Sequence, residues 1–287
     1  MIEVHTRVVE ARGMKITYLE AGEGPAVVLT HGFPDVAESW RPTVEVLAGA
    51  GFRALAPYTR GIGPTTTPPN GDFTAISLAE DLLAFLDALE LERVVLVGQD
   101  WGALFSHLAV SLAPERVEKL VSVAIPHLRT LKPRLGLLRG TWHFIFFQFP
   151  LLPEWFMKRG GWRGIDFFFN SWSPSTSWGA ERLGEVKKAY AQPGTLRAAL
   201  GYYRAMKAAP WSSRARLQRR MATAKTGVPT LTFAGRTDGA LPAAEFRGSA
   251  RAFTGPYELV EVEDAGHFLH LEKPELFHDK LLEFLKT

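Results

Sequence analysis

Residues 93–102, Arg93-Val-Val-Leu-Val-Gly98-Gln99-Asp100-Trp101-Gly102, form a short apolar run that ends in a turn with glycine on both sides. The apolar run predicts a buried strand and the residues from Ala103 to Ala113 predict a helix, so the turn joins a strand to a helix. Its two glycines let the turn fold tightly and push the side chain of Asp100 above the edge of the sheet. Such a turn presents a nucleophile, although an aspartate in this place can also serve only as the cap of the helix.

Strands and helices alternate on both sides of this turn. Before it we expect a hairpin over 4–10 and 14–20, strands over 26–30 and 53–56, and a helix over 78–89 that starts at a capping box of Ser77 and Glu80. After it we expect strands over 117–125, 228–234 and 257–262, and helices around 242–253 and over 274–286. This alternation predicts an α/β protein with a doubly wound, mostly parallel sheet. Strand signals are missing from His127 to about residue 213, which predicts a helical insertion.

The composition is that of an ordinary globular protein. The 287 residues are 46% hydrophobic and 22% charged, which excludes a disordered or a collagen-like chain. The sequence has no cysteine, so a disulfide framework, a thiol nucleophile and a cysteine-ligated zinc are excluded. We assign no cofactor-binding and no metal-binding residue.

The net charge of +3 conceals one strongly basic segment. The segment from His127 to Arg220 contains 17 Lys and Arg against 4 Asp and Glu, together with six of the eight tryptophans. A basic segment can bind nucleic acid or a membrane surface, but no nucleic-acid motif accompanies this one. We therefore expect a solvated basic face on an aromatic core, and no nucleic-acid partner.

No segment is expected to span a membrane. The N-terminus lacks the basic start and the apolar stretch of a secretory signal. The most apolar run, between Arg139 and Glu154, is shorter than the roughly 18 residues of a spanning helix, and Pro150 and Pro153 interrupt it. These features predict a cytoplasmic protein.

Two further polar residues follow predicted strands. Asp238 comes after the strand over 228–234, and His267 comes after the strand over 257–262. In a parallel sheet the carboxyl ends of the strands meet at one edge, where catalytic groups lie. The order nucleophile, acid, histidine therefore makes Asp100, Asp238 and His267 a candidate triad. Asp264 is closer to His267 in sequence, but we expect it to shape the turn.

The segment His31-Gly32-Phe33-Pro34 follows the strand over 26–30. This is the place of the loop that supplies one N–H of an oxyanion hole, while the residue after the nucleophile supplies the other. The predicted donors are the backbone N–H groups of Phe33 and Trp101. An ordinary Gly-Pro turn is the alternative interpretation.

With these motifs, the chain resembles the α/β-hydrolase superfamily along essentially its whole length. Within the superfamily it resembles the branch with an aspartate nucleophile, which contains epoxide hydrolases and haloalkane dehalogenases. HGFP, GQDWG, the aspartate after a strand and DAGHF are specific to that branch. The resemblance implies a helical cap over 127–213, inserted between core segments 1–126 and 214–287, and a substrate pocket between cap and core.

The resemblance also implies a two-step mechanism. An ionised carboxylate such as that of Asp100 attacks a saturated carbon and forms an alkyl ester. Water that His267 has deprotonated then attacks the carbonyl carbon of the ester, while Asp238 orients the imidazole and stabilises its charged form. The N–H groups of Phe33 and Trp101 stabilise the oxyanion that results.

An epoxide needs a further group, because ring opening creates an alkoxide. In epoxide hydrolases two cap tyrosines donate to this oxygen, one of them in a tyrosine-arginine step late in the cap. Tyr203 in Tyr202-Tyr203-Arg204 matches that step. The other family tyrosine precedes a Phe-Gln-x-Pro step, and His143 stands in its place here. Each of these two side chains can also simply pack in the cap.

These residues favour hydrolysis of a small apolar epoxide by water, with two alternatives left open. A haloalkane dehalogenase would use the same triad, but it places Asn after the His-Gly step, where this chain has Phe33. Trp142 or Trp172 would then have to replace the missing halide donor. A binding protein that has kept the fold without the chemistry is the other alternative. The oligomeric state is open.

Overall fold

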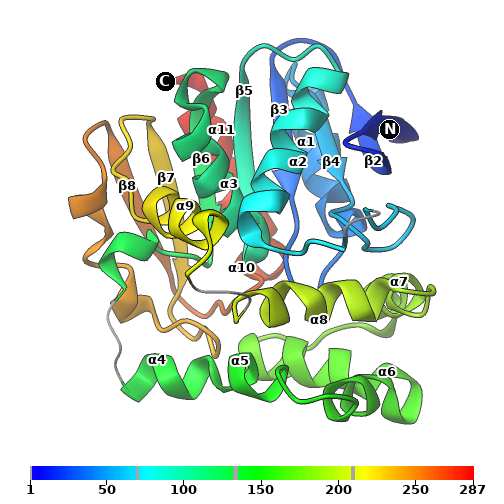
Figure 1. Cartoon of the computed structure of the whole chain (residues 1–287). Helices are drawn as coiled ribbons and strands as arrows, with labels where there is room; N and C mark the ends of the chain where they lie inside the picture. The colour runs from blue at the N-terminus through cyan, green and yellow to red at the C-terminus, as the bar shows by residue number, and fades with distance from the viewer. Residues whose placement is uncertain (1, 69–70, 132–134, 208–210) are drawn as a thin grey trace.

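The computed structural model describes residues 2–68, 71–131, 135–207 and 211–287, and its centre is an eight-stranded sheet. The strand order is β1-β2-β4-β3-β5-β6-β7-β8 (Figure 1). The first two strands form the predicted hairpin and β2 runs antiparallel to β4, whereas all other neighbours are parallel. The strands are β1 His5–Ala11, β2 Met14–Ala21, β3 Ala26–Thr30, β4 Arg53–Pro57, β5 Val94–Gln99, β6 Val117–Val123, β7 Thr230–Gly235 and β8 Tyr257–Val262.

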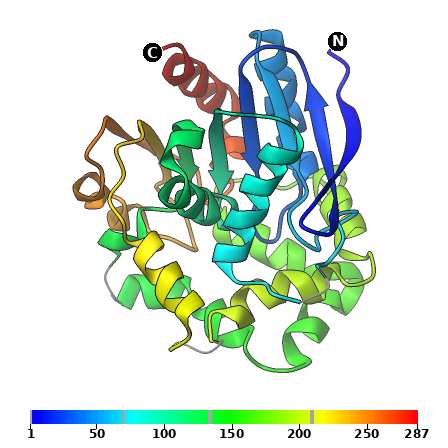
Figure 2. The same ribbon diagram turned by 45° about the horizontal axis from the view of Figure 1, so that its top comes forward.

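Helices cover both faces of this sheet, so the predicted doubly wound α/β fold is confirmed (Figures 1 and 2). On one face α2 (Ala75–Ala88), α3 (Trp101–Leu112) and α9 (Ser213–Ala222) pack together. On the other, α1 (Arg41–Gly49) contacts α11 (Pro274–Lys286), which follows the short α10 (Leu269–Glu272). A strand that is buried on both faces appears in the sequence as a continuous apolar run, and β3 and β5 are examples.

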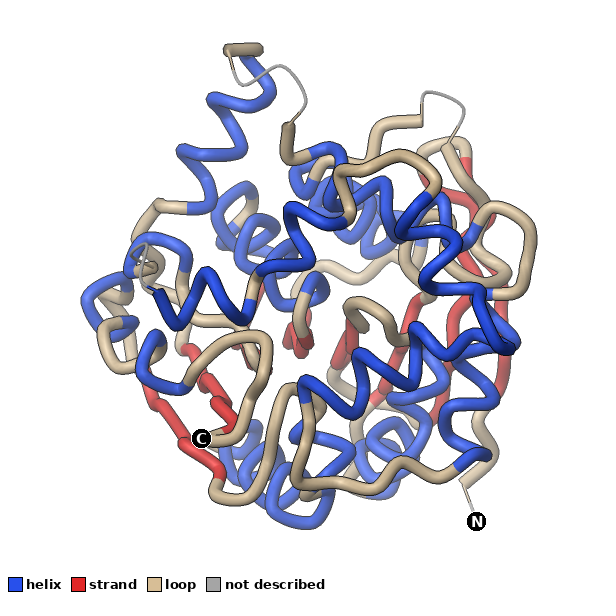
Figure 3. Tube along the Cα trace, turned by 90° about the horizontal axis from the view of Figure 1, so that it is seen from below, coloured by secondary structure: helices blue, strands red, loops and turns tan. Residues whose placement is uncertain are grey.

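Five further helices form a layer beyond the carboxyl ends of the strands (Figures 1 and 3). They are α4 Leu135–Gly140, α5 Trp142–Phe146, α6 Leu152–Trp172, α7 Ala180–Tyr190 and α8 Thr195–Ala205. Helix α6 is interrupted at Arg159–Trp162, where Gly160 and Gly161 adopt positive φ. Among the described residues between β6 and β7 there is no strand, which agrees with a helical insertion. The bounds 127–213 for this cap stay a prediction.

Two local predictions about helices were wrong. Residues 242–253 form two short 3₁₀ helices, Ala243–Glu245 and Ser249–Ala252, instead of an α-helix. Backbone N–H groups in this segment donate to the carbonyl oxygen three residues earlier, as from Phe246 to Ala243 and from Ser249 to Phe246, which is the 3₁₀ pattern.

The predicted capping box at Ser77 and Glu80 is also absent. Helix α2 begins at Ala75 with Thr74 as its cap, so Ser77 lies inside the first turn and its hydroxyl donates to Asp72 at 2.5 Å.

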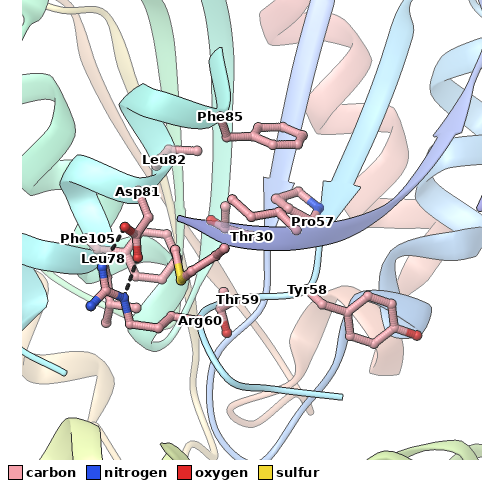
Figure 4. A pocket seen from close by; sticks show the side chains of 12 residues that line it. Thr30, Pro57, Tyr58, Thr59, Arg60, Leu78, Asp81, Leu82, Phe85 and Phe105 are labelled. Carbon is pink, nitrogen blue, oxygen red and sulfur yellow. Dashed lines mark hydrogen bonds and ion pairs between the residues drawn. The ribbon is translucent and has the colours of Figure 1, made fainter. Parts of the chain in front are cut away.

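Hydrogen bonds from the loop after β4 fix the cap on the core. Arg60 in this loop forms a buried ion pair with Asp81 of α2 at 2.5 Å, beside a small cavity (Figure 4). The hydroxyl of Tyr202, on α8, donates to the carbonyl oxygen of Arg60 at 2.6 Å. Helix α8 is thereby held in one position over the sheet, which also fixes the direction of the neighbouring side chain, Tyr203.

No helix in the described part of the chain is long and apolar enough to cross a membrane.

Candidate active site

Asp100 lies on a sharp turn between β5 and α3. Its backbone has φ 52° and ψ −122°, an unusual conformation for a residue with a side chain. Only glycine fits at the two flanking positions, because a side chain there would clash with the neighbouring backbone. A Cβ on Gly98 would lie 2.6 Å from the nitrogen of Ala103, and a Cβ on Gly102 would lie 2.1 Å from the carbonyl oxygen of Thr30. The side chain of Asp100 therefore points away from the sheet toward the cap.

The structure brings the three predicted triad residues together. His267 Nδ1 lies 2.8 Å from Asp238 Oδ2, and His267 Nε2 lies 3.4 Å from Asp100 Oδ2. The other oxygen of Asp238 accepts hydrogen bonds from the backbone N–H groups of Ala240 and Leu241 at 2.7 and 2.9 Å. Asp238 is thus held on both sides, so it can fix the orientation of the imidazole.

Asp264, the alternative acid, adopts a positive φ of 49° in the loop that leads to His267. This conformation is typical of an aspartate in a tight turn. His267 forms ion pairs with Asp238 and Asp100, which supports the choice of Asp238 as the acid.

The charges around His267 decide its protonation state. Burial alone would lower the pKa of this histidine, but the carboxylates of Asp238 and Asp100 outweigh burial and raise the pKa to about 10. The imidazole is therefore protonated at neutral pH as long as both carboxylates are ionised.

The backbone of the HGFP segment reaches the carboxyl group of Asp100. The N–H of Phe33 donates to Asp100 Oδ1 at 2.8 Å. A Cβ on Gly32 would lie 2.4 Å from the Cβ of Asp100, so only glycine permits this approach. Trp101 is the first residue of α3, and the first N–H groups of a helix have no intrahelical acceptor. Both predicted oxyanion donors are therefore next to the carboxyl group.

Two neighbouring tyrosines lie on α8. The hydroxyl of Tyr202 forms hydrogen bonds with the hydroxyl of Thr59 and the carbonyl oxygen of Arg60. Tyr203 is fully buried; the indole N–H of Trp101 can donate to its phenol oxygen, whereas its own O–H has no acceptor among the described residues. Burial and the negative charge of Asp100 raise the pKa of Tyr203 well above its ordinary value of 10, against an opposing effect of the Trp101 side chain. Tyr203 is thus a neutral phenol beside Asp100 with a free donor.

His143, on α5, lies next to Tyr203. Its ring centroid is 5.5 Å from that of Tyr203, and its Nδ1 is buried without a hydrogen-bond partner. Burial lowers the pKa of His143 to about 3, although the charge of Asp100 opposes this effect. The imidazole is therefore neutral at pH 7 and carries one N–H.

A largely apolar cavity of about 300 Å³ is lined by Asp100, Trp101, His143 and His267, whereas Tyr203 is not among its lining residues. Asp100, His143 and His267 are its only ionisable lining residues within the described part of the chain. The apolar walls come from the core and from the cap, and include Leu104, Ile125, Leu131, Leu137, Phe144 and Leu241. Trp172 lines the cavity as well, whereas Trp142 is not among the lining residues.

Two supporting contacts were not predicted from the sequence. The side chain of Gln99 donates to the carbonyl oxygen of His267 at 3.3 Å, and the N–H of His267 donates to the carbonyl oxygen of Trp172 at 3.0 Å. Both fix the loop that carries the histidine. Gln99 is next to Asp100 in sequence, which is a usable signal, but nothing local marks a backbone contact between residues 172 and 267.

The chain belongs to the α/β-hydrolase fold family, which it matches over residues 25–274. Among its relatives, it is 31% identical to Epoxide hydrolase A of Mycobacterium tuberculosis, over 97% of this chain and 96% of that protein. It is 27% identical to the AB hydrolase superfamily protein YfhM of Bacillus subtilis, over 99% of both. These matches confirm the family that the motifs predicted.

Solved structures agree with this assignment. Epoxide Hydrolase A from Mycobacterium thermoresistibile superposes with a TM-score of 0.84 at 25% identity, covering 99% of this chain and 98% of that one. Potato epoxide hydrolase I superposes with a TM-score of 0.84 at 25% identity, covering 99% of both chains.

Proposed function

We propose that this chain hydrolyses a small apolar epoxide to a vicinal diol through an alkyl ester on Asp100. The relatives named epoxide hydrolase span nearly the whole chain, which supports the reaction type. The apolar walls of the cavity support a substrate without charged groups.

In the first step, Asp100 Oδ2 attacks an epoxide carbon, and the bond between that carbon and the ring oxygen breaks. The ring oxygen becomes an alkoxide, to which Tyr203 and His143 donate hydrogen bonds. The O–H of Tyr203 has no acceptor among the described residues, so it faces no competing interaction when the alkoxide develops. The N–H of Phe33 meanwhile holds Asp100 Oδ1 and sets the direction of attack.

Formation of the ester also changes His267. The ester carries no charge, so one of the two carboxylates that raise the pKa of His267 is lost. The imidazolium can then release its proton, which neutralises the alkoxide. A neutral imidazole remains and is available as a general base for the second step.

In the second step, His267 takes a proton from water, and the hydroxide adds to the carbonyl carbon of the ester. The N–H groups of Phe33 and Trp101 stabilise the oxyanion. When this intermediate collapses, the diol oxygen leaves with the proton of the added hydroxyl group, which restores the carboxylate of Asp100 and the imidazolium of His267.

The observation that carries this proposal is the neutral phenol of Tyr203 beside Asp100, whose O–H has no acceptor among the described residues. An alkoxide needs such a donor, whereas a halide leaving group needs only N–H donors. Trp172 lines the cavity beside His267, so dehalogenation is the competing reaction to test.

Purified protein is therefore mixed separately with styrene oxide and with 1-bromobutane. Diol from the first and no bromide from the second is the expected result. Bromide release without diol would favour the dehalogenase, and no product from either would favour a binding protein on the same fold.

A further inference from the structure

The outer surface of the cap carries an unusual number of exposed large apolar side chains. Apart from Trp211 at 83%, the most exposed are Leu151 at 79%, Ile145 at 70% and Trp155 at 60%. Together with Leu138, Phe149 and Leu152 they define what we call the cap patch. Soluble proteins rarely leave so many large apolar residues together in water, so a cluster of this kind marks an interaction surface.

The cap patch draws its residues from three helices and the segment that precedes the last of them: Leu138 from α4, Ile145 from α5, and Leu152 and Trp155 from α6. Helix α4 contacts α5, and Phe146 of α5 packs on Phe156 of α6 with ring centroids 5.5 Å apart. These helices form the layer farthest from the sheet, which Figure 3 views from below. Residues 149–152, Phe-Pro-Leu-Leu, are all exposed and connect α5 to α6.

The interior of the cap is filled by side chains other than those of the cap patch. On the inner side of the same helices, Phe147 and Met157 are completely buried and belong to the core. Helices α5 and α6 are therefore apolar on both sides, and only the inner side has a partner within this chain.

The charge around the cap patch is positive. Exposed basic residues flank it on α4 and α6, namely Arg139, Lys158, Arg159 and Arg163. Residues 131–170 contain two acidic side chains, and both are neutralised within the cap. Glu154 pairs with Arg204 at 2.7 Å, and Asp166 pairs with Lys187 at 2.6 Å.

From this combination we infer that the cap patch docks on an anionic lipid bilayer. Leucine, isoleucine, phenylalanine and tryptophan on one surface enter the boundary between headgroups and acyl chains, while lysine and arginine contact the anionic headgroups. Tryptophan in particular prefers this boundary. A second copy of the chain is the weaker occupant, since two such surfaces face to face would bring like charges together.

The docked cap also places the substrate cavity close to the bilayer. Helices α4 and α5 carry Leu138 and Ile145 of the cap patch, while Leu137 of α4, Phe144 of α5 and Thr141 between them line the cavity. Met206, at the end of α8, lines the cavity and is 51% exposed, so the cavity reaches the surface near this layer. An apolar compound dissolved in the bilayer would thus have a short path to the cavity.

The test is co-sedimentation of the whole protein with phosphatidylcholine vesicles prepared with and without phosphatidylglycerol. We expect binding to the vesicles that contain phosphatidylglycerol and much weaker binding to phosphatidylcholine alone. Leu151→Glu should reduce the vesicle affinity by roughly tenfold or more, because a charge replaces an inserted apolar side chain. Val8→Glu is the matched control, since Val8 is 58% exposed on β1, away from the cap, and this variant should bind like the parent.

A second pair of variants tests the charge contribution. Lys158→Glu should weaken binding by roughly fivefold or more, the effect of about one cation at an anionic surface. Lys15→Glu on β2 is the control and should have no effect. Circular dichroism verifies folding, and Ile145→Glu replaces Leu151→Glu if the latter does not fold.

The proposal would be overturned if the protein bound to neither kind of vesicle, or if Leu151→Glu bound as tightly as the parent. A dimer in analytical ultracentrifugation that Leu151→Glu dissociates would also overturn it, because a second copy would then cover the cap patch.

Discussion

Replacing Tyr203 by phenylalanine removes one oxygen atom and should change activity and stability in opposite directions. The O–H is buried without an acceptor among the described residues, so the folded protein bears the cost of a desolvated donor. Removing such a group should raise the free energy of unfolding by about 1–3 kcal/mol. The ring stays in place through its contacts with Phe147 and Trp101, whose centroids are 4.9 and 5.1 Å away.

The same change should lower kcat/KM for an epoxide. The phenol donates most strongly when the ring oxygen becomes an alkoxide, so its contribution belongs to the transition state. Loss of one or two such bonds corresponds to roughly a ten- to thousandfold decrease, or about 1.4–4 kcal/mol. His143→Phe should cause a similar decrease if the imidazole shares the alkoxide, and the double variant should then be almost inactive.

Tyr202→Phe is the matched control, because it removes the neighbouring hydroxyl, which donates to Arg60 in the core. Its free energy of unfolding should fall by about 1 kcal/mol, and kcat/KM should change much less than in Tyr203→Phe. The assays are initial rates with styrene oxide and urea unfolding followed by tryptophan fluorescence. Unchanged kcat/KM in Tyr203→Phe would refute the role of this hydroxyl and remove the main argument against dehalogenation.

Three other changes test the rest of the site. His267→Gln should form the alkyl ester without hydrolysing it, so mass spectrometry after mixing with an epoxide should show a protein–substrate adduct. Steady turnover without an adduct would contradict the two-step scheme. Asp100→Asn should abolish turnover and lower the pKa of His267 from about 10, because one of the two carboxylates that raise this pKa is removed. An unchanged pKa of His267 in an NMR titration would disprove the effect of Asp100 on this histidine. Acidification below about pH 6.5 should destabilise the fold, since burial lowers the pKa of five buried histidines and of the partly buried His278, which the unfolded chain protonates first. Each of the five buried histidines should contribute a loss of about 1.4 kcal/mol per pH unit until its folded pKa is reached, whereas His267, with its raised pKa, contributes none in this range. Urea unfolding midpoints that do not fall between about pH 7 and about pH 5.5 would contradict this. The five are His31, His107, His127, His143 and His270.

The sequence predicts the core of this fold well, because its strands and long helices have strong local patterns. Strand β8 and helix α11 begin and end at the predicted residues, and the turn at Asp100 has the predicted form. The segment 242–253 was predicted as one helix, but its backbone hydrogen bonds span three residues, which gives two short 3₁₀ helices.

The arrangement of the site depends on contacts between distant parts of the chain. The loops after β7 and β8 were predicted to meet, since the carboxyl ends of parallel strands share one edge. The position of Tyr203 over Asp100 was available only from family resemblance. It depends on the hydrogen bond from Tyr202 to Arg60, which lie 142 residues apart, and no local pattern records such a contact.

The central claim is that Asp100, and not water, attacks the substrate. A single turnover of an epoxide by excess enzyme in oxygen-18 water tests it directly, with mass spectrometry of the diol and of the peptide that contains Asp100. The account predicts an unlabelled diol, since its new oxygen comes from the carboxylate, and one oxygen-18 atom in Asp100. A labelled diol with unlabelled Asp100 would mean that water attacks the epoxide directly, and would contradict the account.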